Sequence, residues 1–381
     1  MFIPFNCSSV MPTSRIYLDE VFKNGKLSGG GSFTKKCTDW IEDQSGAHRA
    51  LLTTSCSHAL DMAARLCDFE PGDEVIMSSY TFPSAANSFV AVGVVVVFVD
   101  IRPDTMNIDE NLIEAAITDR TRAISPMHYA GIACEMDSIN ALAERYRLKV
   151  VEDAAHAVMA SYKGKALGTL SQFGCYSFHE TKNYSMGEGG ALLLRDPKDA
   201  ERAEMILEKG TDRRKFFRGQ VDKYSWKSWG SSYIPSELNA AYLWSQLEVA
   251  QEIHHRRMEI WNQYWHRLSP LADKGLIRLP VIPGECAHPA HIFYFKVKDL
   301  KERTALLRYL TDRGVLAVYH YVPLHSSEAG RKFGRFFGDD VYTTIESERL
   351  IRLPLYYDLS VNAIEYIVQT VYDYFGIKQT E

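Results

Sequence analysis

Short apolar runs alternate with longer helix-like stretches between residues 50 and 200 of the chain. The apolar runs are rich in β-branched residues and have the length of buried strands. Helices are predicted after Pro83, which suits a first helical turn, and over residues 109–117 and 137–147. The predicted strands are residues 74–77, 94–99, 122–126, 148–151, 175–178 and 191–194. Because this alternation is typical of βα units, we expect an α/β fold with a mainly parallel sheet.

The second half of the chain has a different pattern. Residues 236–268 contain neither Gly nor Pro, and Ser236 suits a helix N-cap, so we expect one long helix or two abutting helices that join two domains. The Pro- and Gly-rich residues 279–291 then open a small α+β region. Its predicted strands lie near residues 292–297 and 316–320, and its helices near 302–312, 344–352 and 361–375. The predicted domains are a large one over residues 1–240 and a smaller one, with its linking helix, over residues 241–381.

Composition and charge narrow the class of protein. Of the 381 residues, 46% are hydrophobic and 24% are charged, which suits a globular protein with a packed core. The net charge of −5 argues against nucleic acid or an anionic membrane as a ligand. Seven scattered cysteines without a CxxC pair predict reduced thiols and neither a disulfide framework nor a zinc site. We expect a cytoplasmic protein, because no signal peptide is recognisable and the longest apolar run, residues 89–101, is too short to span a membrane.

Two ionisable side chains follow predicted strands, at the edge where ligands bind in open α/β sheets. Asp153 ends the apolar run of VVEDAAHA, and Lys182 lies in SFHETKNYSMGEGG, just before a loop whose glycines leave the backbone accessible. Each residue alone has an ordinary structural explanation, because a strand-end acid often caps a helix and a lone lysine is usually solvated. Together they match the needs of pyridoxal phosphate, which requires a lysine for its aldehyde and an aspartate for its pyridine nitrogen.

Three further segments suit the same cofactor. TTSCSHAL, residues 53–60, offers hydroxyls and backbone N–H groups to a phosphate at the start of a predicted helix. Ser177 offers another hydroxyl at a strand end. Phe82 in SYTFPSAAN also follows a strand, so its ring can stack on the cofactor. The order and placement of these weak signals favour a pyridoxal phosphate site.

These motifs, in this order, resemble the fold-type I sugar aminotransferases of the DegT/DnrJ/EryC1/StrS family, which act on nucleotide-linked keto-sugars. The resemblance extends over nearly the whole chain and includes GSSYIPSELNAAYLWSQLE and YHYVPLH. It implies pyridoxal 5′-phosphate as the cofactor and the family's fold, in which a large domain with a mixed, mainly parallel sheet precedes a small α+β domain. It also implies a homodimer, or a tetramer made of two such dimers, with active sites shared at the subunit interface.

The resemblance implies a role for each matching residue. Lys182 would carry the cofactor and move the proton, Asp153 would pair with the pyridine nitrogen, His156 would bind the 3′ oxygen and Phe82 would stack on the ring. The phosphate would be held by Cys56, Ser57 and Ser177. The family usually has Gly and Thr in place of Cys56 and Ser57, and the backbone donors survive that change.

The loop that reaches the partner subunit's cofactor departs from the family pattern. Ser232 and Ile234 stand where many members have Asn and Arg, and of the two only Ser232 can donate a hydrogen bond to the phosphate. The nucleotide-sugar pocket would include charged and aromatic residues of FFRGQVDKYSW, namely Arg218, Lys223, Tyr224 and Trp226. A solvated basic loop is the alternative for these four residues.

Two other segments are candidates for the sugar site. His325 in YVPLH would approach the sugar or, alternatively, order its own loop. GKLSGGGSF, residues 25–33, is not a dinucleotide fingerprint, because no strand is predicted before it, and we expect its backbone to line the sugar site.

Within the family, segments such as RPDTMNIDE and HYAGIACEMD are most similar to the transaminases that make dTDP-4-amino-4,6-dideoxygalactose for enterobacterial common antigen. The similarity implies amino transfer from L-glutamate to the 4-keto group of dTDP-4-dehydro-6-deoxy-D-glucose. The alternatives are amination at C3, or at C4 with the opposite configuration, and a catalytically silent regulator that binds pyridoxal phosphate. The family's dehydratases have histidine in place of the lysine, so Lys182 argues against that activity.

Overall fold

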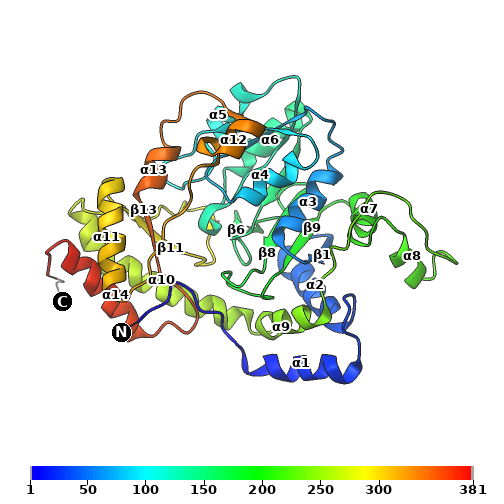
Figure 1. Cartoon of the computed structure of the whole chain (residues 1–381), viewed down its shortest axis with the longest axis horizontal. Helices are drawn as coiled ribbons and strands as arrows, with labels where there is room; N and C mark the ends of the chain where they lie inside the picture. The colour runs from blue at the N-terminus through cyan, green and yellow to red at the C-terminus, as the bar shows by residue number, and fades with distance from the viewer. Residues whose placement is uncertain (1, 379–381) are drawn as a thin grey trace.

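The computed structural model describes residues 2–378, and its centre is an eight-stranded sheet (Figure 1). The strand order is β1-β9-β8-β5-β4-β2-β3-β12. Strand β9 is antiparallel to both of its neighbours, and the other neighbouring pairs of this sheet are parallel. The strands are β1 (Arg49–Thr53), β2 (Glu74–Ser78), β3 (Val95–Val99), β4 (Thr121–Ile124), β5 (Lys149–Asp153), β8 (Phe173–Ser177), β9 (Gly190–Leu194) and β12 (Gly334–Phe336).

Helices cover both faces of this sheet. Successive strand residues point to opposite faces, so that Val150 belongs to one buried cluster and Val151 to the other. One face packs against α1 (Pro12–Asn24), α2 (Ser32–Ser45), α5 (Glu110–Ala116), α6 (Met136–Tyr146) and α9 (Glu237–Leu247). The other packs against α3 (Cys56–Leu66), α4 (Pro83–Val90) and α7 (Pro197–Leu207). The result is the three-layer α/β/α arrangement that the alternating pattern predicts.

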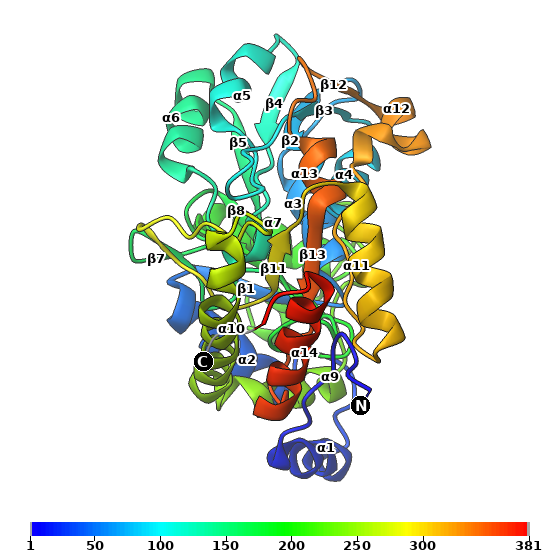
Figure 2. The ribbon, with the colours of Figure 1, turned by 90° about the vertical axis from the view of Figure 1, so that its left-hand side faces the viewer.

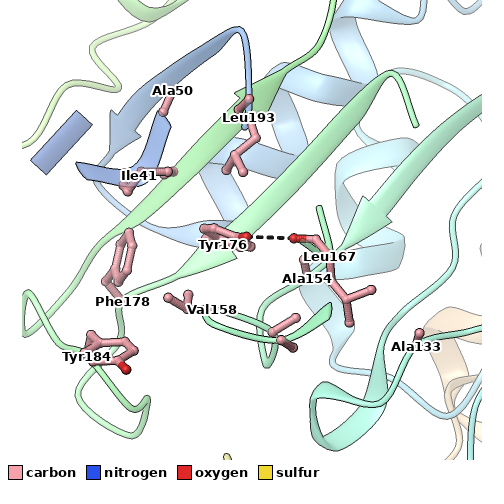
Figure 3. Packing of buried hydrophobic residues seen from close by; sticks show 14 of the residues in the cluster. Ile41, Ala50, Ala133, Ala154, Val158, Leu167, Tyr176, Phe178, Tyr184 and Leu193 are labelled. Atoms are coloured by element: carbon pink, nitrogen blue, oxygen red, sulfur yellow. Dashed lines mark hydrogen bonds between the residues drawn. The ribbon is translucent and has the colours of Figure 1, made fainter. Parts of the chain in front are cut away.

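Figure 3 shows the packing on the first of these faces. The ring of Tyr176 on β8 lies among the buried side chains near Leu193 and Phe178, all in the same apolar cluster. Its hydroxyl donates a hydrogen bond of 2.7 Å to the carbonyl oxygen of Leu167. The buried phenol therefore fills the layer without leaving its polar atom unpaired.

A smaller lobe follows the long helical segment. That segment is two abutting helices, α9 and α10 (Ala250–Asp273), and the Ser236 side chain caps the first by accepting from the N–H of Asn239. The small antiparallel sheet of β11 (Phe293–Lys296) and β13 (Leu350–Leu353) packs against α10, α11 (Leu300–Asp312) and α14 (Val361–Tyr374) (Figure 2). The chain's first described segment joins this lobe, because Ile3 pairs with Val315.

The remaining α-helices and strands are short. They are β6 (Ser161–Tyr162), β7 (Lys165–Ala166), β10 (Cys286–Ala287), α8 (Arg213–Phe217), α12 (Glu328–Phe333) and α13 (Thr343–Arg349). Helix α8 lies in an arm that projects from the sheet beyond α7 (Figure 1). All seven cysteines are free thiols. Within residues 2–378, no helix combines the length and the apolar character that a membrane span requires.

The six strands predicted between residues 74 and 194 are all present, with ends that differ by one or two residues. Two expectations for other segments are wrong, and one strand crosses the predicted domain boundary. Residues 316–320 form no strand, because only Val318 pairs with β13. The helix expected to extend to residue 352 ends at Arg349, and the following residues form β13. The boundary at residue 240 does not separate the lobes completely, because β12 returns to the large sheet and pairs with β3.

Candidate active site

A cavity of about 610 Å³ lies at the carboxyl ends of β5 and β8, where the sequence predicts a ligand site. Asp153 is the last residue of β5, and Ser177 is the last residue of β8; these parallel strands pair directly, with Asp153 opposite Cys175. The cavity brings together the seven residues that the resemblance assigns to the cofactor within one subunit, namely Cys56, Ser57, Phe82, Asp153, His156, Ser177 and Lys182.

The first turn of α3 forms one end of this cavity. Ser55 is the N-cap, and its hydroxyl accepts a hydrogen bond from the N–H of His58 at 3.1 Å. Among the described residues, the N–H groups of Cys56 and Ser57 have no hydrogen-bond partner. The hydroxyls of Ser57 and Ser177 line the same space. This end of the cavity therefore offers neutral donors and a positive helix terminus to an anion.

Gly190 allows α3 to approach the sheet this closely. A Cβ at this position would lie 2.4 Å from the backbone nitrogen of Cys56, so any larger residue must displace the first turn of α3. Gly190 also pairs with Ser177 on one side and Thr53 on the other, which fixes the helix start beside the end of β8. The backbone of the GEGG segment thus lies close to that of α3, as its glycines predict.

Gly190→Ala is expected to destabilise the protein by about 1–3 kcal/mol, because the new methyl group overlaps the backbone of α3. Gly284→Ala is the matched control, since a Cβ there would meet no atom within 4 Å and the backbone needs no left-handed conformation. Its free energy of unfolding should change by no more than about 0.5 kcal/mol. Denaturant unfolding of both variants measures the difference, and equal values would contradict the close approach.

Lys182 lies in a loop that two hydrogen bonds hold in place. Its backbone N–H donates to the carbonyl of His179 at 2.9 Å, and the neighbouring Asn183 amide donates to the carbonyl of Pro289 at 2.8 Å. Burial disfavours the charged ammonium and lowers the pKa of Lys182 to about 8, while the nearby Cys56 and Asp153 act in the opposite direction. Lys182 is therefore not the fully solvated lysine of the alternative explanation.

The Asp153 carboxylate lies deep in the cavity, and only 4% of the residue is exposed. Its Oδ1 accepts a hydrogen bond from the N–H of Ala155 at 3.1 Å. Burial raises its pKa above the ordinary value, although Ala155 and Lys182 oppose that shift. Residues 154–160 form turns, so Asp153 caps no helix and the structural alternative for it is wrong.

His156 is buried beside Asp153's strand with a defined hydrogen-bonding pattern. Its Nδ1 accepts from the backbone N–H of Ala130 at 3.3 Å, which places the proton on Nε2 in the neutral ring. Burial lowers the pKa of His156 well below its usual value, and the positive charge of Lys182 lowers it further. The imidazole is therefore neutral, and its Nε2–H is available as a donor.

The cavity fits pyridoxal phosphate in the chemistry of its donor set. The free N–H groups of α3 and two hydroxyls suit the phosphate, Asp153 supplies a buried carboxylate for a protonated ring nitrogen, and His156 supplies a donor for the 3′ oxygen. Phe82, at the N-cap of α4, is 58% exposed and presents an uncovered ring to the cavity. Lys182 completes this set with an amine for the aldehyde.

Several predicted site residues lie elsewhere in the subunit. Ser232 and Arg218 line a second cavity of about 810 Å³, together with Gly29 and its neighbouring glycines from the predicted sugar-binding segment. Arg218 is also paired with Glu204 at 2.8 Å. Lys223, Tyr224 and Trp226 lie on the exposed arm beyond α8. One subunit therefore does not bring these five residues to Lys182.

His325, predicted either to approach the sugar or to order its own loop, does not line the cavity of Lys182. Its two ring nitrogens are already engaged: Nδ1 with the Ser79 hydroxyl at 2.7 Å and Nε2 with Asp340 at 3.2 Å. These contacts tie the loop after Pro323 to β2 and to the loop before α13. The structural alternative for His325 is therefore the one that the contacts favour.

The cavity also contains residues that the sequence did not single out. They come from the smaller lobe and the N-terminal segment, namely Phe5, His291, His320, Tyr321 and Arg352. The rings of His156 and His291 contact each other at a tilt, with their centroids 4.2 Å apart, and His320 stacks on Tyr321 with a centroid distance of 3.9 Å. Of these five residues, His320 and Tyr321 lie in YHYVPLH, a segment that carries part of the family resemblance. The others lie in unremarked segments that only the fold brings to the site.

Comparisons with known proteins identify the family of the chain. The model of the DegT/DnrJ/EryC1/StrS aminotransferase family matches residues 12–372. The spore coat polysaccharide biosynthesis protein SpsC of Bacillus subtilis is 31% identical over 98% of this chain and 97% of that protein. The aminotransferase TlmJ of Streptoalloteichus hindustanus is 28% identical, with a TM-score of 0.90 over 99% of both chains.

A solved structure with lower identity shares the same fold. The PLP form of the putative sugar aminotransferase Spr1654 of Streptococcus pneumoniae is 24% identical, with a TM-score of 0.90 over 98% of both chains. A PMP form of that protein matches equally well. The chain therefore belongs to the DegT/DnrJ/EryC1/StrS aminotransferase family, with the fold-type I architecture and the pyridoxal 5′-phosphate cofactor that the sequence predicts.

Proposed function

We propose that the protein transfers an amino group from L-glutamate to the C4 keto carbon of dTDP-4-dehydro-6-deoxy-D-glucose, giving dTDP-4-amino-4,6-dideoxy-D-galactose and 2-oxoglutarate. The observation that carries amino transfer is that Lys182, whose pKa is about 8, and the buried Asp153 line one cavity. The choice of sugar rests on the sequence resemblance. SpsC, named for spore coat polysaccharide biosynthesis, supports a role in making a cell-surface polysaccharide.

Lys182 has the properties of a proton carrier. When bound, pyridoxal phosphate supplies an electron sink that stabilises negative charge on a carbon attached to its nitrogen. With the cofactor bound, the amino donor would release the Lys182 amine, and Nζ would take the proton from the donor Cα and pass it to the cofactor. In the second half of the reaction, Nζ would take a proton back from the cofactor and deliver it to the sugar carbon that had been the ketone. A pKa of about 8 suits both transfers, because the amine is readily protonated and deprotonated near neutral pH.

The other cavity residues hold the reacting groups in place. Asp153 would accept a hydrogen bond from the protonated pyridine nitrogen and keep the positive charge there. His156 would donate from Nε2 to the 3′ oxygen, since its Nδ1 is occupied by Ala130. Ser57, Ser177 and the N–H groups at the start of α3 would bind the phosphate. Phe82 would stack on the ring and exclude water from that face.

We propose that a second subunit completes the site. The cavity that contains Arg218 and Ser232 lies apart from Lys182, so within one subunit these residues have no cofactor to contact. In a homodimer of this family's type, Ser232 would donate to the partner's cofactor phosphate. The glycine-rich segment beside it and the exposed Tyr224 and Trp226 would then contact the nucleotide sugar.

The lowered pKa of Lys182 predicts the pH dependence of its reactivity in protein freed of cofactor. A neutral amine reacts with trinitrobenzenesulfonate, whereas the ammonium does not. The Lys182 amine is charged below about pH 8 and neutral above it, so a fast phase of modification should rise through that pH. Ordinary lysines, with a pKa near 10.4, react later. The phase should be absent from Lys182→Ala, and a midpoint near pH 10 would contradict the lowered pKa.

The reaction itself tests the proposed function. The holoenzyme is incubated with dTDP-4-dehydro-6-deoxy-D-glucose and L-glutamate, and the product is examined by NMR. An axial amino group at C4 is expected, which identifies the galacto configuration. An equatorial C4 amine or a C3 amine from the corresponding ketone would assign the alternative sugars. Cofactor binding without amino transfer to any nucleotide-linked keto-sugar would instead favour the silent regulator.

A further inference from the structure

Arg352 on β13 is a buried cation that points into the cavity of Lys182. Only 6% of the residue is exposed, and it lines the cavity on the side formed by the smaller lobe. Its backbone pairs with Val318, and the Phe5 ring covers its guanidinium at 4.6 Å. The side chain is therefore held in one place by both the sheet and the N-terminal segment.

The charge of Arg352 has no counterion among residues 2–378. Its Nη1 donates to Nε2 of His320, a neutral group, and its buried Nε has no hydrogen-bond partner. The two carboxylates that line the cavity are engaged elsewhere, because Asp153 accepts from Ala155 and Glu188 lies 3.5 Å from His179. A buried guanidinium without an anion is costly, so this arrangement favours the binding of an anionic ligand.

The orientation of Arg352 is set before any ligand binds. Since Nη1 donates to His320 Nε2, the proton of the neutral imidazole lies on Nδ1, and that ring stacks on Tyr321 at 3.9 Å. Nε and Nη2 remain free, and these two atoms form one edge of the guanidinium fork. Two parallel donors in a plane match the two oxygens of a carboxylate.

Two anions of the proposed reaction are already accounted for at other places. The cofactor phosphate suits the first turn of α3, which belongs to the larger lobe, and the nucleotide diphosphate suits the cationic cavity shared with a second subunit. The remaining anions are the carboxylates of the amino donor, which must come close to Lys182 Nζ. Arg352 is near enough to Lys182 that its charge lowers the pKa of that amine.

We infer that Arg352 binds a carboxylate of the amino-acid donor through its Nε and Nη2 edge and thereby determines that the donor is an amino acid. His320 and Phe5 are positioning residues that hold the guanidinium in the orientation required. This inference rests on the proposed function for the identity of the ligand as the amino donor. It does not depend on which sugar receives the amino group.

Binding of glutarate to the holoenzyme tests the inference without turnover, because this dicarboxylate has no amino group to transfer. Calorimetric titration should show that Arg352→Gln raises the Kd of glutarate by about 10- to 100-fold, the loss expected for a charge-assisted hydrogen-bonded pair. Arg352→Lys should also weaken binding, since a point charge replaces the fork. Unchanged Kd values in both variants, or no binding of glutarate to the unmodified protein, would overturn the inference.

Arg349→Gln is the matched control. Arg349 lies three residues away, but it is paired with Glu346 at 2.9 Å and does not line the cavity. Its removal should leave the Kd of glutarate unchanged. Thermal unfolding of each variant shows whether the fold survives, and Arg352→Lys keeps the charge if Arg352→Gln fails to fold.

The two half-reactions separate this inference from the proposed function. With Arg352→Gln, KM for L-glutamate should rise about 10- to 100-fold, while the reaction of the aminated cofactor form with the keto-sugar is unchanged. A loss confined to the keto-sugar half would assign Arg352 to the nucleotide and overturn the inference. If the unmodified enzyme converts glutamate but aminates no nucleotide sugar, the proposed function fails and the inference stands.

Two simpler donors identify which carboxylate Arg352 binds. L-Alanine has only the α-carboxylate, and 4-aminobutyrate has only the carboxylate that corresponds to the glutamate side chain. Sensitivity of the alanine reaction to Arg352→Gln assigns the α-carboxylate, and sensitivity of the 4-aminobutyrate reaction assigns the side-chain carboxylate. If the variant affects neither donor, the inference is wrong.

Discussion

Lys182→Ala is expected to reduce the rate of transamination by at least about 10³-fold, the upper part of the range for removal of a positioned acid–base group. The alanine can neither hold the cofactor aldehyde nor move a proton between the donor Cα and the cofactor. Lys182, with a pKa of about 8, has no equivalent among the buried histidines of the cavity, because burial lowers the pKa of His156, His291 and His320 well below the usual value and makes them weak bases. Steady-state turnover of glutamate measures the loss.

The same variant should lose the visible absorption of the holoenzyme, which comes from the bond between lysine and the cofactor. Lys165→Ala is the control, because this exposed lysine on β7 is remote from the cavity. It should keep both the colour and the rate. Unchanged turnover in Lys182→Ala would remove Lys182 from the mechanism altogether.

Asp153→Asn is expected to lower kcat/KM for glutamate by about 10²- to 10⁴-fold. The substitution keeps the shape of the side chain, and its oxygen can still accept from Ala155, but it removes the negative charge opposite the pyridine nitrogen. Loss of one partner from a buried charge pair costs about 3–5 kcal/mol, and 1.36 kcal/mol corresponds to a tenfold change. Single-turnover conversion of the holoenzyme by glutamate measures the effect on the first half-reaction.

Asp137→Asn provides the comparison for Asp153→Asn. Asp137 is an exposed acid on α6 whose partner is Lys163, and its neutralisation should leave kcat/KM within about twofold of the unmodified enzyme. A kcat/KM for Asp153→Asn equal to that of Asp137→Asn would mean that the ring nitrogen needs no charged partner.

The part of the site that follows strands was predictable from the sequence. Asp153, Ser177 and Lys182 each come at or just after an apolar run, and the carboxyl ends of parallel strands meet at one edge of a sheet. Gly190 carried a readable signal as well, because a glycine next to a strand indicates close backbone approach. These inferences need only local pattern and sheet geometry.

The contribution of the smaller lobe was not predictable in this way. His291, His320 and Arg352 come from three separate segments, and nothing in their immediate sequence marks them as parts of one wall. Residues 350–353 continue a stretch without Gly or Pro and read as helix, yet they form β13 because β11 offers hydrogen bonds to them. Residues 316–320 have strand-like composition but pair only at Val318. In both segments, the presence or absence of a neighbouring strand decides the secondary structure.

Two of the predicted site residues lie apart from Lys182 within the subunit. Arg218 and Ser232 face a cavity that lacks Lys182, and both were assigned to the site from the family pattern. A sequence motif carries no information on whether its residues act in their own subunit or in a partner. His325 was likewise ambiguous by sequence, because its partners Ser79 and Asp340 lie in segments far from it along the chain.

The most direct measurement is the identity of the lysine that carries the cofactor. The holoenzyme is reduced with borohydride, which makes the bond to the cofactor permanent, and the digested protein is analysed by mass spectrometry. We predict a single phosphopyridoxyl-modified peptide, with the modification on Lys182. Modification of any other lysine, with Lys182 unmodified, would show that the cavity at the ends of β5 and β8 is not the active site.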